Sequence, residues 1–294
     1  MKKNTGTFRF VQKLMGALIF STLFINLTAP SDIYAQGMDG SPYKPGVDTN
    51  IDMYIGSWLN SMPRHSHGSL VERDILTKGD PLNPPYQGAV LRFANKLAYA
   101  TLDAGASTSP TILKEEQEIF YINKGVGIIS AGGETANLFK GITVLIPEGL
   151  EFTMTNTGKE PLIMYLISDP TKPNAKPNDK MKVRDENKIP YAGSTGHWCH
   201  LPKVLFTKAD GLSSIDNVLT VSLDPMTIAQ PHYHGANTEE VWVMVDGCSI
   251  LFLGKQIRLQ PEGTGFKVPS DGKTNHSNIN TSSERIKMFY FAKY

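Results

Sequence analysis

Three histidines and one glutamate in the last quarter of the sequence have the types and spacing of metal ligands. His232 and His234 are two positions apart, so on an extended strand both imidazoles leave the same face. Glu240 opens the run 240–245, whose valine and tryptophan content predicts a strand. His276 follows a turn-like segment and supplies a third imidazole. Three neutral imidazoles and one carboxylate suit a divalent transition metal.

The order of these residues resembles the two motifs of the cupin superfamily. His-x-His, a short gap, Glu, six residues and Gly describe the first motif and fit 232–247, although five residues between His234 and Glu240 make the gap longer than usual. A Pro-x-Gly-type turn with a downstream His and Asn describes the second motif and fits 269–280, again with a longer turn. The alternative is that these are unrelated surface and loop histidines. Because all four ligand types occur in the expected order, we favour the metal site.

An earlier part of the chain repeats this pattern without its histidines. The segment 118–147 matches 240–269 from the glutamate that opens a strand to the proline of the second turn. Such a repeat predicts two copies of one structural unit. Short strand-like runs alternate with Gly and Pro turns, and no long amphipathic helical pattern is found. We therefore predict an all-β fold of two tandem cupin (double-stranded β-helix or jelly-roll) barrels.

The first copy has lost most of the ligands. Alignment of the copies places Thr111 and Leu113 at the first two histidine positions and Phe152 at the third, so only Glu118 remains. We expect this barrel to be degenerate and metal-free, with a structural role. A second interpretation is that Glu118 lines a separate pocket, because a carboxylate inside a barrel must be paired, hydrogen-bonded or protonated.

The N-terminus has the composition of a secretory signal. A basic start precedes the mostly apolar stretch 14–27, and Ala35 is a plausible cleavage point. The stretch is short for a membrane span, so we expect a secreted or periplasmic protein with no stable span in the mature chain, an uncleaved anchor being the alternative. The formal net charge of +1 gives no reason to expect a nucleic-acid partner.

The predicted divisions follow from these features. They are a signal peptide (1–35), a flexible N-terminal lead-in (36–70), a first barrel (71–170), a proline-rich and charged linker (171–190) and a second, metal-binding barrel (191–294).

Strand alternation adds candidates for a substrate pocket. Trp242 and Met244 share the parity of Glu240 and are expected to point inward, although core filling is the favoured role of Met244. Asn280 shares the parity of His276 and is expected to support a ligand by a hydrogen bond. The pocket candidates are Trp242, Met244, Asn280 and Glu118.

Each copy is preceded by a pair of histidines. Lead-in segments of two-barrel cupins often run across to the neighbouring barrel, so the resemblance implies that one of these histidines approaches the metal pocket. His65 and His67 are predicted to be a surface or interface pair rather than a second metal site. His197 and His200 fit a lid, a metal site or packing equally well. Cys199 and Cys248 could form one disulfide, but their spacing does not decide it.

The resemblance implies a class of chemistry rather than one reaction. Cupins include dioxygenases, decarboxylases, isomerases, lyases and aminohydrolases, so the expected function is an exported, metal-dependent enzyme acting on a small polar molecule. The alternative is a non-catalytic cupin that binds or senses a small molecule. A purely structural role like that of seed storage globulins would leave the ligand set unexplained. The expected cofactor is one divalent ion of Mn, Fe, Ni, Co, Cu or Zn, and homo-oligomer formation is expected from resemblance.

Overall fold

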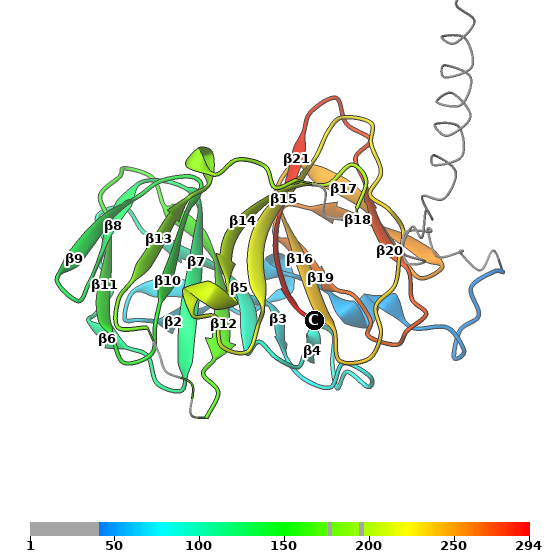
Figure 1. Cartoon of the computed structure of the whole chain (residues 1–294), viewed down its shortest axis with the longest axis horizontal. Helices are drawn as coiled ribbons and strands as arrows, with labels where there is room; N and C mark the ends of the chain where they lie inside the picture. Colours follow the sequence, from blue (N-terminus) through cyan, green and yellow to red (C-terminus); the bar gives the residue numbers. More distant parts are fainter. Residues whose placement is uncertain (1–40, 174, 176–177, 194–196) are drawn as a thin grey trace, which may run out of the picture. The chain divides into compact units, whose positions relative to one another are not determined.

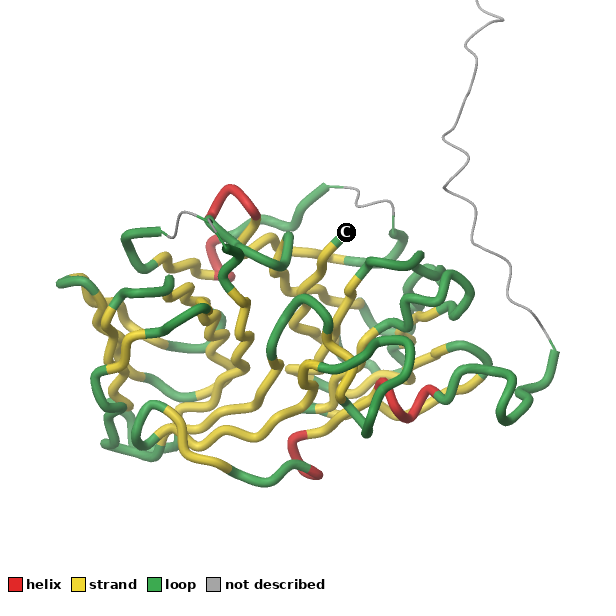
Figure 2. The backbone as a smooth tube through the Cα atoms, turned by 90° about the horizontal axis from the view of Figure 1, so that it is seen from below, coloured by secondary structure: helices red, strands yellow, loops and turns green. Residues whose placement is uncertain are grey.

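Antiparallel strands make up almost all of the regular structure. The computed structural model describes residues 41–173, 175, 178–193 and 197–294, and its strands form two barrels, with β2 to β13 in the first and β14 to β21 in the second (Figure 1). Within these described residues, helical structure is confined to short 3-10 turns, seen as brief red segments in Figure 2. The predicted all-β fold is confirmed. The predicted signal peptide lies outside the described residues.

The first barrel consists of a large and a small sheet. The large sheet has the order β13-β10-β7-β12-β5-β3-β2, with β4 paired to β3. The small sheet has the order β6-β11-β8-β9. The bounds are β2 Arg64–Ser66, β3 Leu70–Lys78, β4 Ala89–Leu91, β5 Lys96–Leu102, β6 Thr111–Ile112, β7 Glu116–Lys124, β8 Gly127–Ala131, β9 Glu134–Leu138, β10 Ile142–Ile146, β11 Glu151–Asn156, β12 Leu162–Pro170 and β13 Lys182–Asp185.

The second barrel repeats this arrangement. Its large sheet has the order β1-β19-β16-β21-β15-β14 and its small sheet the order β18-β17-β20. The bounds are β1 Ile55–Ser57, β14 Leu201–Thr207, β15 Asn217–Leu223, β16 Glu239–Asp246, β17 Cys248–Leu253, β18 Gln256–Pro261, β19 Thr264–Lys267, β20 His276–Ile279 and β21 Ile286–Lys293, and the 3-10 turns are η1 Ile51–Tyr54, η2 Trp58–Asn60, η3 Glu186–Lys188 and η4 Lys208–Asp210.

The edge strands show that the two barrels exchange their lead-in segments. Strand β1 precedes the first barrel in sequence, yet it pairs with β19 of the second barrel. Strand β13 precedes the second barrel and pairs with β10 of the first. Because the two sheets otherwise follow the same order, β1 and β13 occupy equivalent places. The implied crossing of lead-in segments is therefore present in the backbone.

The lead-in differs from the flexible segment that its composition predicts. Ile51 and Tyr54 are buried and belong to a hydrophobic core that also contains residues of both barrels. The Tyr54 hydroxyl donates to the carbonyl of Pro81 at 2.7 Å. Apolar side chains placed among Gly, Pro and Asp residues gain burial that the local composition does not reveal. A second core fills the first barrel.

Two buried carboxylates join the barrels in a reciprocal way. Asp169 on β12 of the first barrel accepts the backbone N–H groups of residues 213–215, just before β15, at 2.7–3.1 Å. Glu239 on β16 of the second barrel accepts those of residues 92–94, just before β5, at 2.5–3.3 Å. Backbone amides that point at an ionised carboxylate form strong hydrogen bonds. Each barrel thus supplies a carboxylate that holds a loop of the other barrel by hydrogen bonds.

Replacement of Asp169 by Ala should lower the free energy of unfolding by about 2–4 kcal/mol, because the amides of residues 213–215 lose a charged acceptor in a buried place. Chemical denaturation of Asp169→Ala measures this change. The matched control is Asp103→Ala at an exposed position, which should stay within roughly 0.5 kcal/mol of the wild type. Equal stability of the two variants would contradict the role given to Asp169.

Candidate metal centre

Four side chains of the second barrel converge on one point. Glu240 lies on β16 and His276 on β20, while His232 and His234 lie in the connection between β15 and β16. Their ligand atoms all lie within 4.8 Å of one another. His232 and His234 are not on a regular strand as predicted. An isolated bridge to His276 holds this segment, with backbone hydrogen bonds of 2.8 and 3.3 Å between His232 and His276.

The distances within this group suit a shared cation. His234 Nε2 lies 2.7 Å from Glu240 Oε2, and His276 Nε2 lies 2.9 Å from Glu240 Oε1. The Nε2 atoms of His232 and His234 are buried, and neither has a hydrogen-bond partner among the described residues. Buried polar atoms without partners are rare and call for an explanation. A metal ion bound between these side chains would coordinate such closely spaced donor atoms, which are not aligned for hydrogen bonds with one another.

The surroundings prepare the group for metal binding. His232 Nδ1 lies 2.9 Å from the carbonyl of Gln230; donation of a proton there leaves the lone pair on Nε2, facing the other ligands. Trp242 Nε1 donates to Glu240 Oε1 at 2.8 Å, and Tyr294 Oη donates to Glu240 Oε2 at 3.0 Å. Burial alone would raise the pKa of Glu240, but His276 and His234 beside it hold that pKa well below its usual range. Glu240 is therefore an anion.

A cavity of about 340 Å³ opens beside this group. The His197 ring lies 4.4 Å from the His232 ring, and the His200 ring lies 5.5 Å from Trp242, measured between centroids. Tyr290 and Tyr294 share a hydrogen bond between their hydroxyls at the wall of the cavity. Aliphatic side chains complete the lining, which consists of His197, His200, Pro202, Asn217, Leu219, Val221, His234, Glu240, Trp242, Tyr290 and Tyr294.

The predicted pocket residues lie in different environments in the structure. Trp242 lines the cavity as expected, and Met244 is fully buried in the hydrophobic core. The prediction for Asn280 is wrong, because its amide donates to the backbone carbonyls of Leu223, Asp224 and Glu284 at 2.8–3.2 Å instead of supporting a ligand. Asn156 makes the corresponding bonds in the first barrel. This asparagine therefore clamps a turn in both copies.

The lead-in histidines lie in their own barrels. His197 and His200 line the cavity of the second barrel, although β13 just before them pairs with the first. His65 is exposed as predicted. The prediction for His67 is wrong, because its side chain is 9% exposed and contacts Glu118 inside the first barrel, with 3.0 Å between Nε2 and Oε2. Nothing in the local sequence distinguishes His67 from His65.

Two further residues of the first barrel join Glu118 and were not singled out from the sequence. Glu72 on β3 and Lys96 on β5 are neighbours of Glu118, with the Lys96 ammonium 2.8 Å from Glu72 and 3.6 Å from Glu118. The expectation that Glu118 must be paired is met by these contacts. Phe152, which replaces the third ligand histidine, packs 5.3 Å from the His67 ring. In the second barrel, both cysteines are exposed and free.

Comparison with known proteins agrees with the fold. Residues 98–168 match the family model of the cupin domain. Among solved structures, a deletion mutant of Bacillus subtilis oxalate decarboxylase is 13% identical, with a TM-score of 0.61 over 82% of this chain and 76% of that one. A putative glyoxylate-induced protein from Pseudomonas aeruginosa is 13% identical, with a TM-score of 0.63 over 87% and 96%. AerE from Microcystis aeruginosa is 11% identical, with a TM-score of 0.60 over 82% and 98%.

These matches and the duplicated barrel show that residues 98–168 form a cupin domain and that the chain has the fold of two-barrel cupins. The family model covers the first barrel and not the one with the histidine motif. No curated protein matches the sequence. Within the described residues, no helix has the length and apolar character needed to cross a membrane.

The stability of the metal-free protein should fall in acid, and His200 should contribute to this fall. Burial, helped by the neighbouring His197, lowers the pKa of His200 from 6.5 to about 4. The unfolded chain takes up a proton near pH 6.5 and the folded one does not, so the contribution is complete above that pH and is lost as the pH falls toward 4.

Chemical denaturation in the presence of a chelator at about pH 7.5 and about pH 5 measures this effect. The decrease in unfolding free energy should be about 1–2 kcal/mol smaller in His200→Gln than in the wild type. His65→Gln, at an exposed position, is the control and should behave as the wild type. An unchanged pH dependence in His200→Gln would contradict the assignment.

Proposed function

We propose that the second barrel binds one divalent transition metal through His232, His234, Glu240 and His276, and that the protein is a metal-dependent enzyme acting on a small polar molecule. The convergence of four buried donor atoms next to a cavity is the observation that supports this proposal. Four protein ligands leave positions on an octahedral ion for oxygen atoms of a substrate. When bound, the ion would supply Lewis-acid polarisation or a site for oxygen chemistry.

The charge of the site favours an anionic substrate. A divalent ion with one carboxylate ligand carries a net charge of about +1. Among the described residues, no lysine or arginine lines the cavity, so a negatively charged group would bind at the ion itself. The volume of about 340 Å³ is at the lower end of the range of small-molecule sites. A small carboxylate, enediol or hydroxy-ketone that offers two oxygen atoms fits these limits.

The chain also offers groups that can hold a proton beside the substrate. Tyr294 donates to Glu240 and also shares a hydrogen bond with the Tyr290 hydroxyl, so its own hydroxyl lies next to a ligand and faces the cavity. His197 and His200 have lowered pKa values because of burial, so both are neutral near pH 7 and able to accept a proton. These side chains are the candidates for proton transfer and substrate positioning.

The named relatives agree with this substrate class. Oxalate decarboxylase acts on a two-carbon dicarboxylate by its name, and the Pseudomonas protein is described as glyoxylate-induced. At 11–13% identity the likeness does not transfer a reaction. We therefore extend the proposal only to the class of small carboxylic acids and to decarboxylase, dioxygenase, isomerase or lyase chemistry. The N-terminal leader supports export to the periplasm or the exterior, and formation of a homo-oligomer remains part of the proposal.

A binding or sensing role is the second candidate. Glu240 is the only carboxylate among the described residues that line the cavity. As a metal ligand, it is not available as a separate general acid or base. The described lining of the cavity therefore offers no second carboxylate to act as the general acid or base that many hydrolytic and lyase reactions use. A protein that holds a small acid at its metal without changing it would need no such group.

Metal content tests the ligand assignment. Protein purified without chelators should contain a divalent transition metal, and His276→Ala should lose about one ion per chain relative to the wild type, because a missing ligand weakens binding strongly. Elemental analysis of both proteins gives the answer. His65→Ala serves as the control and should keep the content of the wild type. Equal metal content in all three proteins would refute the assignment.

Turnover separates the two candidate functions. Metal-replete protein incubated with oxalate, glyoxylate and small hydroxy acids should consume one of them, and His276→Ala should not, since the substrate binds at the ion. Product analysis measures consumption, and a thermal shift with the same acids measures binding. A rise in Tm without any consumption would support the binding role and rule out enzymatic action on these acids.

A further inference from the structure

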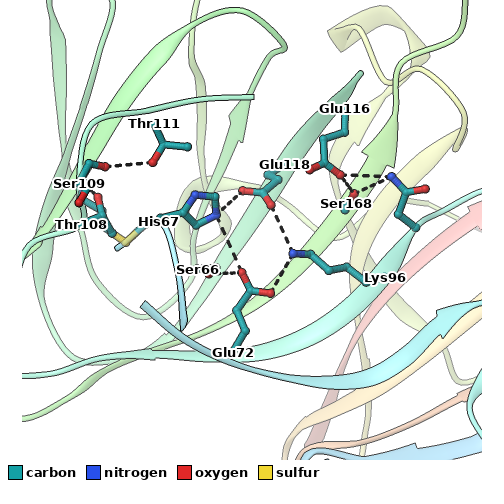
Figure 3. Close-up of polar contacts among 12 residues, drawn as sticks. Ser66, His67, Glu72, Lys96, Thr108, Ser109, Thr111, Glu116, Glu118 and Ser168 are labelled. Carbon is teal, nitrogen blue, oxygen red and sulfur yellow. Dashed lines mark hydrogen bonds and ion pairs between the residues drawn. The ribbon is translucent and has the colours of Figure 1, made fainter. Parts of the chain in front are cut away.

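The first barrel contains a second group of converging donor atoms. His67, Glu72 and Glu118 each offer one ligand atom, and these atoms all lie within 4.8 Å of one another (Figure 3). The side chains are 9%, 0% and 1% exposed, respectively. The strand registers align this barrel with the second, since Thr77 pairs with Lys96 as Thr207 pairs with Asn217. In this alignment His67, Glu72 and Lys96 correspond to His197, Pro202 and Asn217, which line the cavity of the second barrel.

The geometry of this group resembles that of the candidate metal centre. His67 Nε2 lies 3.0 Å from Glu118 Oε2 and 3.9 Å from Glu72 Oε1. Neither His67 Nε2 nor Glu118 Oε2 has an aligned hydrogen bond, although both are buried, which is also true of His234 Nε2 beside Glu240. Ligands that bind a metal at about 2.1 Å lie roughly 3.0–3.5 Å apart. The observed distances are close to this range.

Lys96 lies close to one oxygen of each carboxylate and leaves the other oxygen facing His67. Its ammonium lies 2.8 Å from Glu72 Oε2 and 3.6 Å from Glu118 Oε1, which are the oxygens that do not face His67. The other oxygen of each carboxylate remains on the histidine side, where Glu72 Oε1 also accepts from Ser66 (Figure 3). Lys96 therefore neutralises one acid without occupying the space between the three ligand atoms.

With a divalent cation bound, the first-barrel group would carry about the same net charge as the second-barrel site with its ion. Two carboxylates, one ammonium and a divalent ion sum to about +1, the same as Glu240 with its ion. Arg64 also contacts Glu72 at 2.6 Å, but its side chain is 40% exposed, so solvent screens its charge. Lys96 thus offsets the extra carboxylate of the first barrel.

The backbone holds His67 in an uncommon conformation that turns it inward. Its φ is 47°, and Gly68 follows with a φ of 83°. The carbonyl of His67 accepts the N–H of Ser109 at 2.8 Å, and a Cβ on Gly68 would come within 2.4 Å of the Ser109 hydroxyl. Non-glycine residues in this region are few and tend to occur at functional sites.

We propose that the first barrel binds a second divalent cation through His67 Nε2, Glu72 Oε1 and Glu118 Oε2, with Lys96 as counter-charge to the outer carboxylate oxygens. The site uses two carboxylates and one imidazole, which are harder donors than the three imidazoles and one carboxylate of the second barrel. Carboxylate-rich sites suit Mn²⁺, and Zn²⁺ also accepts carboxylate oxygens together with histidine. This proposal replaces the expectation that the first barrel is metal-free, and it does not depend on the activity of the second.

A variant without the second-barrel site isolates the proposed one. The double variant His232→Ala/His276→Ala, stripped with a chelator and loaded separately with Mn²⁺ or Zn²⁺, should retain about one ion per chain of at least one of them. Addition of His67→Gln should reduce this content by about tenfold or more, because removal of one of three ligands leaves two carboxylates already paired with Lys96. Elemental analysis after desalting measures the content.

Two controls keep the result interpretable. His65→Gln in the same double variant removes the exposed neighbour of the His-x-His sequence and should leave the metal content unchanged. The same ion should raise the Tm of the double variant and not that of its His67→Gln derivative, which separates loss of binding from loss of folding. Absence of both ions from the folded double variant would overturn the proposal and mean that Lys96 and His67 alone compensate the two acids. This result would leave the second-barrel proposal intact.

Discussion

A buried carboxylate at the same position of two barrels is the constraint on which both sites depend. Glu118 and Glu240 occupy equivalent places on β7 and β16 and are 1% and 2% exposed. An ionised carboxylate inside a barrel is costly unless its charge is compensated. The second barrel surrounds Glu240 with three histidines, a tryptophan N–H and a tyrosine hydroxyl. The first surrounds Glu118 with one histidine and one lysine. The two barrels thus share one constraint and meet it with different residues.

The exchange of lead-in segments connects this constraint with the architecture. Strands β1 and β13 each complete the sheet of the other barrel, and Asp169 and Glu239 each hold a loop of the other barrel. The chain that leaves each exchanged strand then returns to its own barrel and brings a histidine with it. His67 and His197 arrive in this way at corresponding positions. The same duplication that builds the fold therefore supplies side chains to both interiors.

The sequence was sufficient for the features that depend on local spacing. The spacing of His232, His234, Glu240 and His276 predicted four side chains that the structure brings together, and the repeat of 118–147 in 240–269 predicted the duplicated fold. The sequence was insufficient for features that depend on contacts between residues far apart in the chain. His65 and His67 share one local pattern, yet His65 is exposed, whereas His67, whose carbonyl accepts the N–H of Ser109, has a side chain that is 9% exposed and contacts Glu118. Strand parity alone also misassigned Asn280, because the strand ends at Ile279 and the chain turns there.

Crystallography with anomalous scattering at the absorption edge of the bound metal tests the central claim most directly. The account predicts a strong peak within about 2.0–2.3 Å of the Nε2 atoms of His232, His234 and His276 and of a Glu240 oxygen. Crystals of metal-loaded protein with no anomalous peak among these four side chains would contradict the account.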